Sequence, residues 1–395
     1  MSVLQNNINP APPNFLMNGF SGLKEFSFKP EEFVVEEITL DGSVFEVGTA
    51  VETKGEALEK DYFTRFVLEK KEWNTEQALR ELAFFLHVKP SRFNYAGTKD
   101  RNAITTQLCS VFALPPERLL QANGKIKDLR INGAWVSRGK VKLGDLQGNR
   151  FTIALNEQNC GVKPDIQKIL AKAASSNFLF PNFFGLQRFG SLRKNTADVG
   201  GLLLKGDFEG AVWNYLAFSE GEKDEESVAG RKRLAEEKDF AKALEYYPRH
   251  LKYERLLLEH LAKSPNDFVG ALGKMPRHLV LMFIHAFQSK LFNEMLEARM
   301  GEGNWNAAEK GLLVGGDSVL GEREKLLLER EGLSQDSFKI KQMPFLSSKG
   351  GERKFFAELK GFEVVEETAE SVKVRFSLES GCYATVALSF LLSQD

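Results

Sequence analysis

The chain is poor in the residues that build disulfide frameworks and metal centres. Its 395 residues include three cysteines and five histidines. The cysteines, Cys109, Cys160 and Cys382, are widely scattered, so they predict no disulfide framework and no C-x-x-C metal pair. No histidine has a second histidine or a cysteine at metal-ligand spacing, and we therefore expect no zinc site. These absences favour a reducing compartment, and we expect the protein to be cytoplasmic.

Long apolar segments and common catalytic motifs are also missing. The longest strongly apolar run, 279–287, is far shorter than the roughly 20 residues of a membrane-spanning helix. Residues 1–19 lack a basic start followed by an apolar stretch, so we expect no signal peptide. There is no G-x-x-x-x-G-K-[ST] phosphate loop, no strand-linked G-x-G-x-x-G and no G-x-S-x-G elbow. A carboxylate remains as the main candidate for catalysis.

What the chain does contain is typical of a globular protein with an uneven charge distribution. It is 43% hydrophobic and 27% charged, with a net charge of −1, and it is long enough to predict two domains. Between Lys89 and Arg150 there are 12 Lys and Arg against 4 Asp and Glu. This basic segment is either a surface for phosphates or an ordinary exposed face. The 32 Phe residues indicate core packing, with base stacking as the alternative for a few rings.

The first part of the chain alternates between predicted strands and one clear helix. We expect a strand within 26–39, a helix that begins at Asn74 or Thr75 and ends near His87, and a strand within 103–114. Residues 97–102 therefore form a polar loop between two extended segments. Loops held by a rigid sheet are where catalytic side chains usually lie.

The rest of the chain predicts a discontinuous domain with an insertion. We expect a strand pair in 140–153, a helix in 165–175, long helices after about Lys205, and a strand in the alternating segment 372–378. The predicted organisation is a catalytic core whose first part is 1–205, an inserted domain of 206–350, and a last core part of 351–395.

Asp100 is the candidate carboxylate in the predicted loop. It follows Gly97 and lies between Lys99 and Arg101. Adjacent cations favour its ionised form, which a nucleophile or a base needs. The alternative is an ordinary charged turn, because Lys-Asp-Arg triplets are frequent.

The residues around Asp100 carry a family resemblance. The run 96–107, AGTKDRNAITTQ, closely resembles the signature A-G-x-K-D-x-x-A-x-T-x-Q of the TruD family of pseudouridine synthases. Further blocks are similar to family patterns in the same order: P-E-D-F-x-V-x-E at 30–37, K-x-x-x-N-T at 70–75, L-G…G-N-x-F at 143–151, N-[YF]-F-G-x-Q-R-F-G at 182–190, a helix of the inserted domain at 288–293, and G-x-[FY]-A-T at 381–385. The blocks cover nearly the whole chain.

The resemblance implies a fold and a reaction. The fold would be mixed α/β (α+β), with a mixed or antiparallel sheet in the pseudouridine synthase core and a mostly helical inserted domain. The reaction would be the isomerisation of uridine to pseudouridine in structured RNA, typically at position 13 of tRNA, without metal or cofactor. We expect a monomer whose partner is RNA and not a membrane.

The resemblance also implies roles for six residues. Asp100 would be the catalytic carboxylate, acting either covalently or by removing a ribose proton to give a glycal. Phe184 would stack on the base, with core packing as the alternative, and Asn182 would support it. Tyr383 matches an aromatic position that is often Phe. Lys99 and Arg188 would pair with Asp100 or with a phosphate.

One departure from the family and two rival functions remain. Some members carry a lysine three residues before the proline of P-E-D-F, where this chain has Ser27, with Lys29 just before the proline. The first rival is a non-catalytic RNA-binding or RNA-folding protein on the same scaffold. The second is a glycosidic-bond hydrolase, which would need Glu36 or Glu37 as a second catalytic carboxylate.

Overall fold

The computed structural model describes residues 22–52, 55–56, 60–190, 192–303 and 305–393. These residues form two compact units. The sheet unit consists of Lys24–Phe180 and Ala357–Leu392, and the helical unit is built on Pro181–Phe356. The segment 1–19, for which we expect no signal peptide, lies outside the described residues. None of the described helices is long and apolar enough to cross a membrane.

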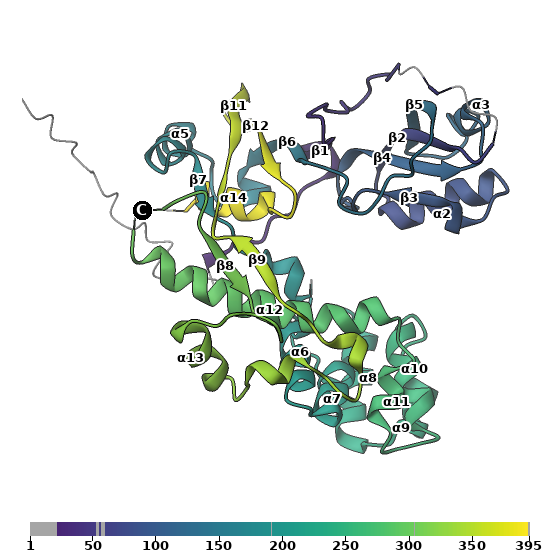
Figure 1. Ribbon diagram of the computed structural model, residues 1–395, viewed down its shortest axis with the longest axis vertical. Helices are drawn as coiled ribbons and strands as arrows, with labels where there is room; N and C mark the ends of the chain where they lie inside the picture. Colours follow the sequence, from purple (N-terminus) through teal and green to yellow (C-terminus); the bar gives the residue numbers. More distant parts are fainter. Residues whose placement is uncertain (1–21, 53–54, 57–59, 191, 304, 394–395) are drawn as a thin grey trace, which may run out of the picture. The chain divides into compact units, whose positions relative to one another are not determined.

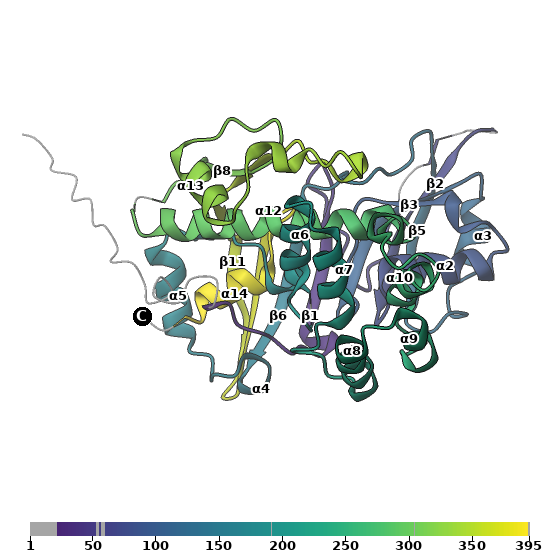
Figure 2. The same cartoon turned by 90° about the horizontal axis from the view of Figure 1, so that it is seen from below.

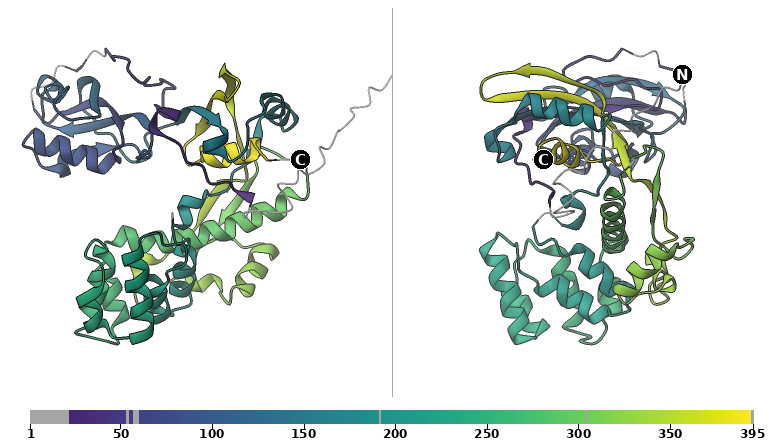
Figure 3. Two further views of the ribbon diagram at one scale, coloured as in Figure 1. Left: turned by 180° about the vertical axis from the view of Figure 1, so that it is seen from behind. Right: turned by 90° about the vertical axis from the view of Figure 1, so that its left-hand side faces the viewer.

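An eight-stranded sheet forms the centre of the sheet unit (Figure 1). Its strands follow the order β11-β12-β6-β1-β4-β2-β5, and β3 pairs with β4. Among the described strands of this sheet, only β1 and β4 pair in parallel. The strands are β1 (Phe33–Ile38), β2 (Phe63–Lys71), β3 (Phe93–Tyr95), β4 (Ile104–Phe112), β5 (Leu129–Ser137), β6 (Gly148–Asn156), β11 (Lys360–Glu367) and β12 (Ser371–Glu379). Figure 3 shows β11 and β12 as a long hairpin.

Short helices accompany the sheet. They are η2 (Pro30–Glu32), α2 (Thr75–Phe85), η3 (Pro90–Arg92), α3 (Pro116–Leu120), α4 (Glu157–Cys160), α5 (Ile166–Ser175) and α14 (Ala384–Leu391). The N-cap of α2 is Asn74, whose side chain accepts a hydrogen bond from the Gln77 amide at 2.7 Å. The buried face of α2, including Leu79 and Leu82, packs on apolar side chains of β2 and β4. These contacts hold the start of α2 close to the sheet.

The helical unit is dominated by the 24-residue helix α12 (Arg277–Met300). Figure 2 shows α6 beside it, and α7 packs against α6. Gly200 of α6 lies so close to α12 that an added Cβ atom would be 2.1 Å from the Phe283 carbonyl oxygen. The other elements are η4 (Leu186–Phe189), α6 (Thr196–Leu204), α7 (Phe208–Ala217), α8 (Glu225–Glu237), α9 (Phe240–Tyr246), α10 (Lys252–Leu261), α11 (Phe268–Leu272), β8 (Lys310–Leu313), α13 (Glu322–Arg330), η5 (Gln335–Phe338), η6 (Pro344–Leu346) and β9 (Gly351–Lys354).

Two short strands mark where the chain passes between the units. They are β7 (Leu179–Pro181) and β10 (Phe356–Glu358), and they pair with each other. The chain therefore leaves the sheet unit and returns to it at neighbouring places.

The mixed α/β fold class is confirmed, and most of the expected elements exist. The exception is the strand pair expected in 140–153, since only its second half forms a strand, as part of β6. Val141 is instead held by a hydrogen bond from its amide to the Ser110 hydroxyl at 2.9 Å. A turn follows, in which the Lys142 amide donates to the Asp145 carboxylate at 2.8 Å. The buried residue Val141 thus packs from a loop and not from a strand.

Candidate functional site

Asp100 lies in the sheet unit, in the connection between β3 and β4 where a loop was predicted. Its side chain is exposed to solvent. Among the described residues, none donates a hydrogen bond to its carboxylate or pairs with it at ion-pair distance. The carboxylate is therefore open to a ligand, and the backbone that carries it has to be held by other groups.

Lys70 of β2 holds that backbone. Its side chain is almost completely buried, at 1% exposure. The Lys70 Nζ donates to the carbonyl oxygen of Asp100 at 2.8 Å and to that of Lys99 at 3.3 Å. Two consecutive carbonyl groups of the loop therefore point toward one ammonium group.

Lys99 is held by a buried ion pair. Its Nζ lies 2.6 Å from the Glu37 Oε2, and the two side chains are 4% and 0% exposed. The other oxygen of Glu37 accepts a hydrogen bond from the Leu108 amide at 2.9 Å. Because Glu37 is on β1 and Leu108 on β4, the parallel strand pair carries the partner of Lys99.

Thr75 and Gln107 complete the support of the loop. The hydroxyl of Thr75 accepts a hydrogen bond from the Lys99 amide at 2.9 Å and donates to the Gln107 Oε1 at 2.8 Å. The Gln107 Nε2 donates to the Gly97 carbonyl oxygen at 2.9 Å. We call Glu37, Lys70, Thr75, Lys99 and Gln107 the loop anchor. Its members come from three of the sequence blocks, which the fold brings together around one loop.

Desolvation and neighbouring charges shift the pKa of Asp100 in opposite directions. Desolvation by the surrounding protein raises the pKa of Asp100 above its ordinary value, and the charges of Lys70 and Lys99 act to lower it. Desolvation lowers the pKa of Lys70 to about 8, against the attraction of Asp100. Each group therefore favours the charged form of the other.

Phe184 lies in the helical unit and is 8% exposed. The Asn293 side chain holds its backbone, with bonds of 2.8 Å to the Phe184 amide and 3.0 Å to the Phe184 carbonyl oxygen. The Phe184 ring meets the edge of the Phe292 ring at 5.6 Å between centroids. The Arg353 guanidinium lies 4.2 Å from the ring centroid, and that of Arg188 lies 5.6 Å from it. Phe184 is thus a buried aromatic ring with two cationic neighbours.

Asn182 and Arg188 are held by the same region of the helical unit. The Asn182 Oδ1 accepts a hydrogen bond from Arg353 at 2.6 Å, and its Nδ2 donates to the Lys354 carbonyl oxygen at 3.0 Å. Arg188 donates from its Nε to the Ser289 hydroxyl at 3.1 Å. Asn182 therefore orients Arg353, which in turn covers Phe184.

Tyr383 is half-buried and lies in the sheet unit at the start of α14. Its carbonyl oxygen accepts hydrogen bonds from the Val386 and Ala387 amides at 3.1 and 3.2 Å. The six predicted residues thus belong to two units: Asp100, Lys99 and Tyr383 to the sheet unit, and Asn182, Phe184 and Arg188 to the helical unit.

The chain is similar over its length to known proteins. The family model of tRNA pseudouridine synthase D (TruD) matches residues 22–318 and 312–389. A probable tRNA pseudouridine synthase D of Methanopyrus kandleri is 35% identical over 349 residues, which cover 84% of this chain and 86% of that protein. The chain belongs to the TruD family.

A second TruD relative matches nearly the full length of this chain, and a solved TruD structure matches its fold. The probable tRNA pseudouridine synthase D 1 of Methanocaldococcus jannaschii is 33% identical over 397 residues, with coverage of 96% of this chain and 98% of that protein. The crystal structure of the putative TruD from Methanosarcina mazei superposes with a TM-score of 0.69 at 28% identity, covering 94% of each chain.

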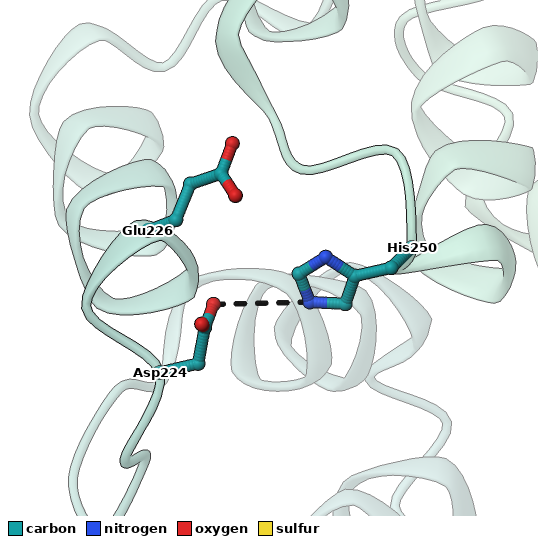
Figure 4. A group of neighbouring side chains, drawn as sticks. All are labelled: Asp224, Glu226 and His250. Atoms are coloured by element: carbon teal, nitrogen blue, oxygen red, sulfur yellow. Dashed lines mark ion pairs between the residues drawn. The ribbon is translucent and has the colours of Figure 1, made fainter.

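One group of side chains in the described part of this TruD chain has the residue types of a metal site. Asp224, Glu226 and His250 have ligand atoms within 4.8 Å of one another, and all three are exposed (Figure 4). The Asp224 carboxylate caps α8 by accepting from the Ser227 amide at 2.8 Å, and the Ser227 hydroxyl lies 3.2 Å from the His250 Nε2. Helix capping therefore accounts for the position of Asp224, and Ser227 lies between Asp224 and His250.

The structure changes two interpretations of individual residues. Lys99 pairs with Glu37 and not with Asp100. Glu37 is buried in that pair, and Glu36 pairs with Arg150 at 2.7 Å, so neither glutamate is available as the second carboxylate of a hydrolase.

Sequence reasoning missed Lys70, which binds the Asp100 loop, and Arg353, which lies over the Phe184 ring. Lys70 stands in the K-x-x-x-N-T block, but the block alone gave it no role. Arg353 lies outside all the blocks. Ser27 and Lys29, which mark the departure from the family, are both exposed.

Proposed function

We propose that this protein is a pseudouridine synthase that isomerises uridine in tRNA, with Asp100 as its catalytic carboxylate. The observation that carries the proposal is an exposed carboxylate without a hydrogen-bond donor, on a loop whose backbone is fixed by a buried anchor. Family membership supports the same reaction, because the relatives are named tRNA pseudouridine synthases D.

The reaction needs little beyond such a carboxylate. The C–N bond between base and ribose breaks, the uracil turns over, and a C–C bond forms to the same ribose carbon. An ionised carboxylate can attack covalently or remove a ribose proton to give a glycal, and both routes regenerate it. The target uridine has to leave the RNA stack to reach Asp100.

The other site residues keep proposed roles in binding RNA. Phe184 is the proposed stacking ring, supported by Asn182, and Arg188 and Tyr383 are proposed contacts with RNA. We assign Lys99 to the loop anchor in place of its expected contact with substrate, because its ammonium is buried beside Glu37. Uridine 13 of tRNA is the proposed target.

The test is conversion of a tRNA transcript by the purified protein without added metal or nucleotide. Wild type should form pseudouridine, detected by mass spectrometry of the digested RNA. Asp100→Asn should lower kcat by at least about 10³-fold, because loss of a nucleophile or base removes the chemical step itself. RNA affinity should remain within a few-fold.

Asp128→Asn is the matched control, since it removes a carboxylate of the same unit outside the loop anchor. Its turnover should equal that of wild type. A transcript with cytidine at position 13 should lose modification if that uridine is the target. Full turnover in the Asp100→Asn protein would refute Asp100 as the catalytic carboxylate. RNA binding without any conversion by wild type would favour the non-catalytic alternative.

A further inference from the structure

Two buried lysines lie near Asp100, and they differ in their partners. The Lys99 ammonium is paired with Glu37 at 2.6 Å. Lys70 has no carboxylate at ion-pair distance among the described residues, and its contacts are the carbonyl oxygens of Lys99 and Asp100. Lys70 is therefore a buried cation whose hydrogen bonds all go to the backbone of the loop that carries Asp100.

Removing such an ammonium group from water costs free energy, so the presence of a positive charge at this buried position needs an explanation. A neutral donor could satisfy the two carbonyl groups without the desolvation of a full charge. Among the groups that face Lys70, Lys99 repels its charge and Asp100 favours it, while burial raises the pKa of the Cys109 thiol and keeps this group neutral. Asp100 provides the largest favourable interaction, which connects the buried charge with the exposed carboxylate.

We propose that Lys70 is the positioning residue of Asp100: its ammonium fixes the two loop carbonyls, and its positive charge stabilises the ionised carboxylate. This inference rests on the proposed function, since it names the group that prepares the catalytic carboxylate. It assigns Lys70 a role through Asp100 and no contact with RNA.

The expected pH effect has a definite sign. Desolvation raises the pKa of Asp100, while Lys70 and Lys99 oppose this rise. The Lys99 charge is shared with Glu37, so removal of the Lys70 charge should raise the pKa of Asp100 further. The shift should be roughly one unit, at the lower end of what a neighbouring opposite charge produces. Asp100 would then gain a proton at a higher pH than in wild type.

The experiment compares Lys70→Gln, Lys70→Arg and Lys71→Gln. Glutamine can still donate a hydrogen bond but has no charge, whereas arginine keeps the charge. Lys71 is the next residue of β2 and pairs with the exposed Glu31, so it controls for loss of a lysine from the same strand. The Asp100 carboxyl carbon is followed by carbon-13 NMR of RNA-free protein, assigned with Asp100→Asn, alongside the pH profile of kcat/KM.

We expect Lys70→Gln to move both the NMR titration of Asp100 and the acid limb of kcat/KM upward by roughly one unit. Its kcat/KM should fall about tenfold on the acid limb, where Asp100 is mostly protonated, and recover as the pH rises. Lys70→Arg should restore most of the wild-type profile, and Lys71→Gln should match wild type. A purely structural role for Lys70 would lower activity equally at all pH values and leave the Asp100 titration unchanged.

An unchanged Asp100 titration in folded Lys70→Gln would overturn the inference. If the Lys70→Gln variant does not fold, the NMR titration of Asp100 in the wild-type protein tests the inference instead. Its Asp100 signal should show a second, smaller inflection as Lys70 loses its proton near pH 8, and absence of that inflection would equally overturn it. Failure of the proposed function would give a different result. Wild type would then convert no tRNA, although the NMR titration would still show that Lys70 influences Asp100.

Discussion

At the residue scale, the proposed site separates the carboxylate that we propose to react from the groups that hold its loop. Asp100 is exposed, whereas Lys70, Lys99 and Glu37 beneath it are buried. A carboxylate that accepted several hydrogen bonds would be stabilised and less reactive as a base. By fixing the loop through backbone carbonyls and amides, the anchor leaves the carboxylate oxygens to the substrate.

The buried pair of Lys99 and Glu37 gives a prediction about stability. Lys99→Met would leave the Glu37 carboxylate charged and without its partner at 0% side-chain exposure. Loss of one partner of a buried ion pair typically costs about 3–5 kcal/mol. We expect that loss in the free energy of unfolding of the sheet unit, measured by urea titration.

The control for this prediction is the double variant Lys99→Met with Glu37→Leu, which removes both charges. It should recover part of the lost stability because no unpaired charge remains buried. A single variant as stable as wild type would contradict the prediction.

The sequence predicted Asp100 at this scale but could not predict the partner of Lys99. The candidate carboxylate follows from its motif and its loop. The contact of Lys99 with Glu37 depends on the parallel register of β1 and β4, in which Glu36 lies opposite Thr106. Such pairing between distant segments is not encoded in local spacing.

At the element scale, four of the five anchor residues lie in strands or at the first residue of a helix, and Lys99 lies in the loop itself. Thr75 is the first residue of α2, directly after the N-cap Asn74. This position directs its hydroxyl to both the Lys99 amide and Gln107. Capping of α2 and positioning of the Asp100 loop are therefore linked through two adjacent residues.

Thr75→Val tests that link with nearly unchanged side-chain volume. The Lys99 amide would lose its acceptor while buried, a loss of about 1–3 kcal/mol. A displaced loop should also lower kcat by about 10- to 100-fold, since small errors in the position of a catalytic group are costly. Turnover of tRNA and thermal unfolding measure the two effects.

Thr75→Ser keeps a hydroxyl at this position and should retain most of the activity. Equal activity of the valine and serine variants would mean that the hydroxyl of Thr75 does not contribute to the function of the loop.

At this scale the sequence located α2, and Asn74, one of the two candidate caps, is its N-cap. The first half of the strand pair expected in 140–153 was wrong, because alternating apolar residues in a loop can show the same pattern as a strand.

At the scale of the whole molecule, the helical unit interrupts the sheet unit. The change from strand patterns to helical patterns and back allowed the interruption to be predicted. The compact units divide the chain at Phe180 and Pro181 and again at Phe356 and Ala357. The boundaries of the inserted domain at 206 and 350 stay a prediction, since a compact unit need not coincide with an inserted segment.

The division into units predicts that the sheet unit can fold by itself. Its sheet and its apolar clusters are formed by its own residues. The chain ends at the junction are close together, because β7 pairs with β10 and the Leu359 amide donates to the Phe178 carbonyl oxygen at 2.8 Å. A short glycine-rich linker can therefore join Phe180 to Ala357 at a small entropic cost.

The joined protein should keep the Asp100 loop but lose turnover, because Asn182, Phe184 and Arg188 are absent. NMR should show the carbon-13 signal of Asp100 with a pH titration close to that of the full chain, since the loop anchor belongs entirely to the sheet unit. Conversion of tRNA by the joined protein at the full rate would show that the proposed residues of the helical unit are not needed for the reaction. A native-like Asp100 titration without conversion would mean that the sheet unit prepares the carboxylate and that residues of the helical unit are needed to use it.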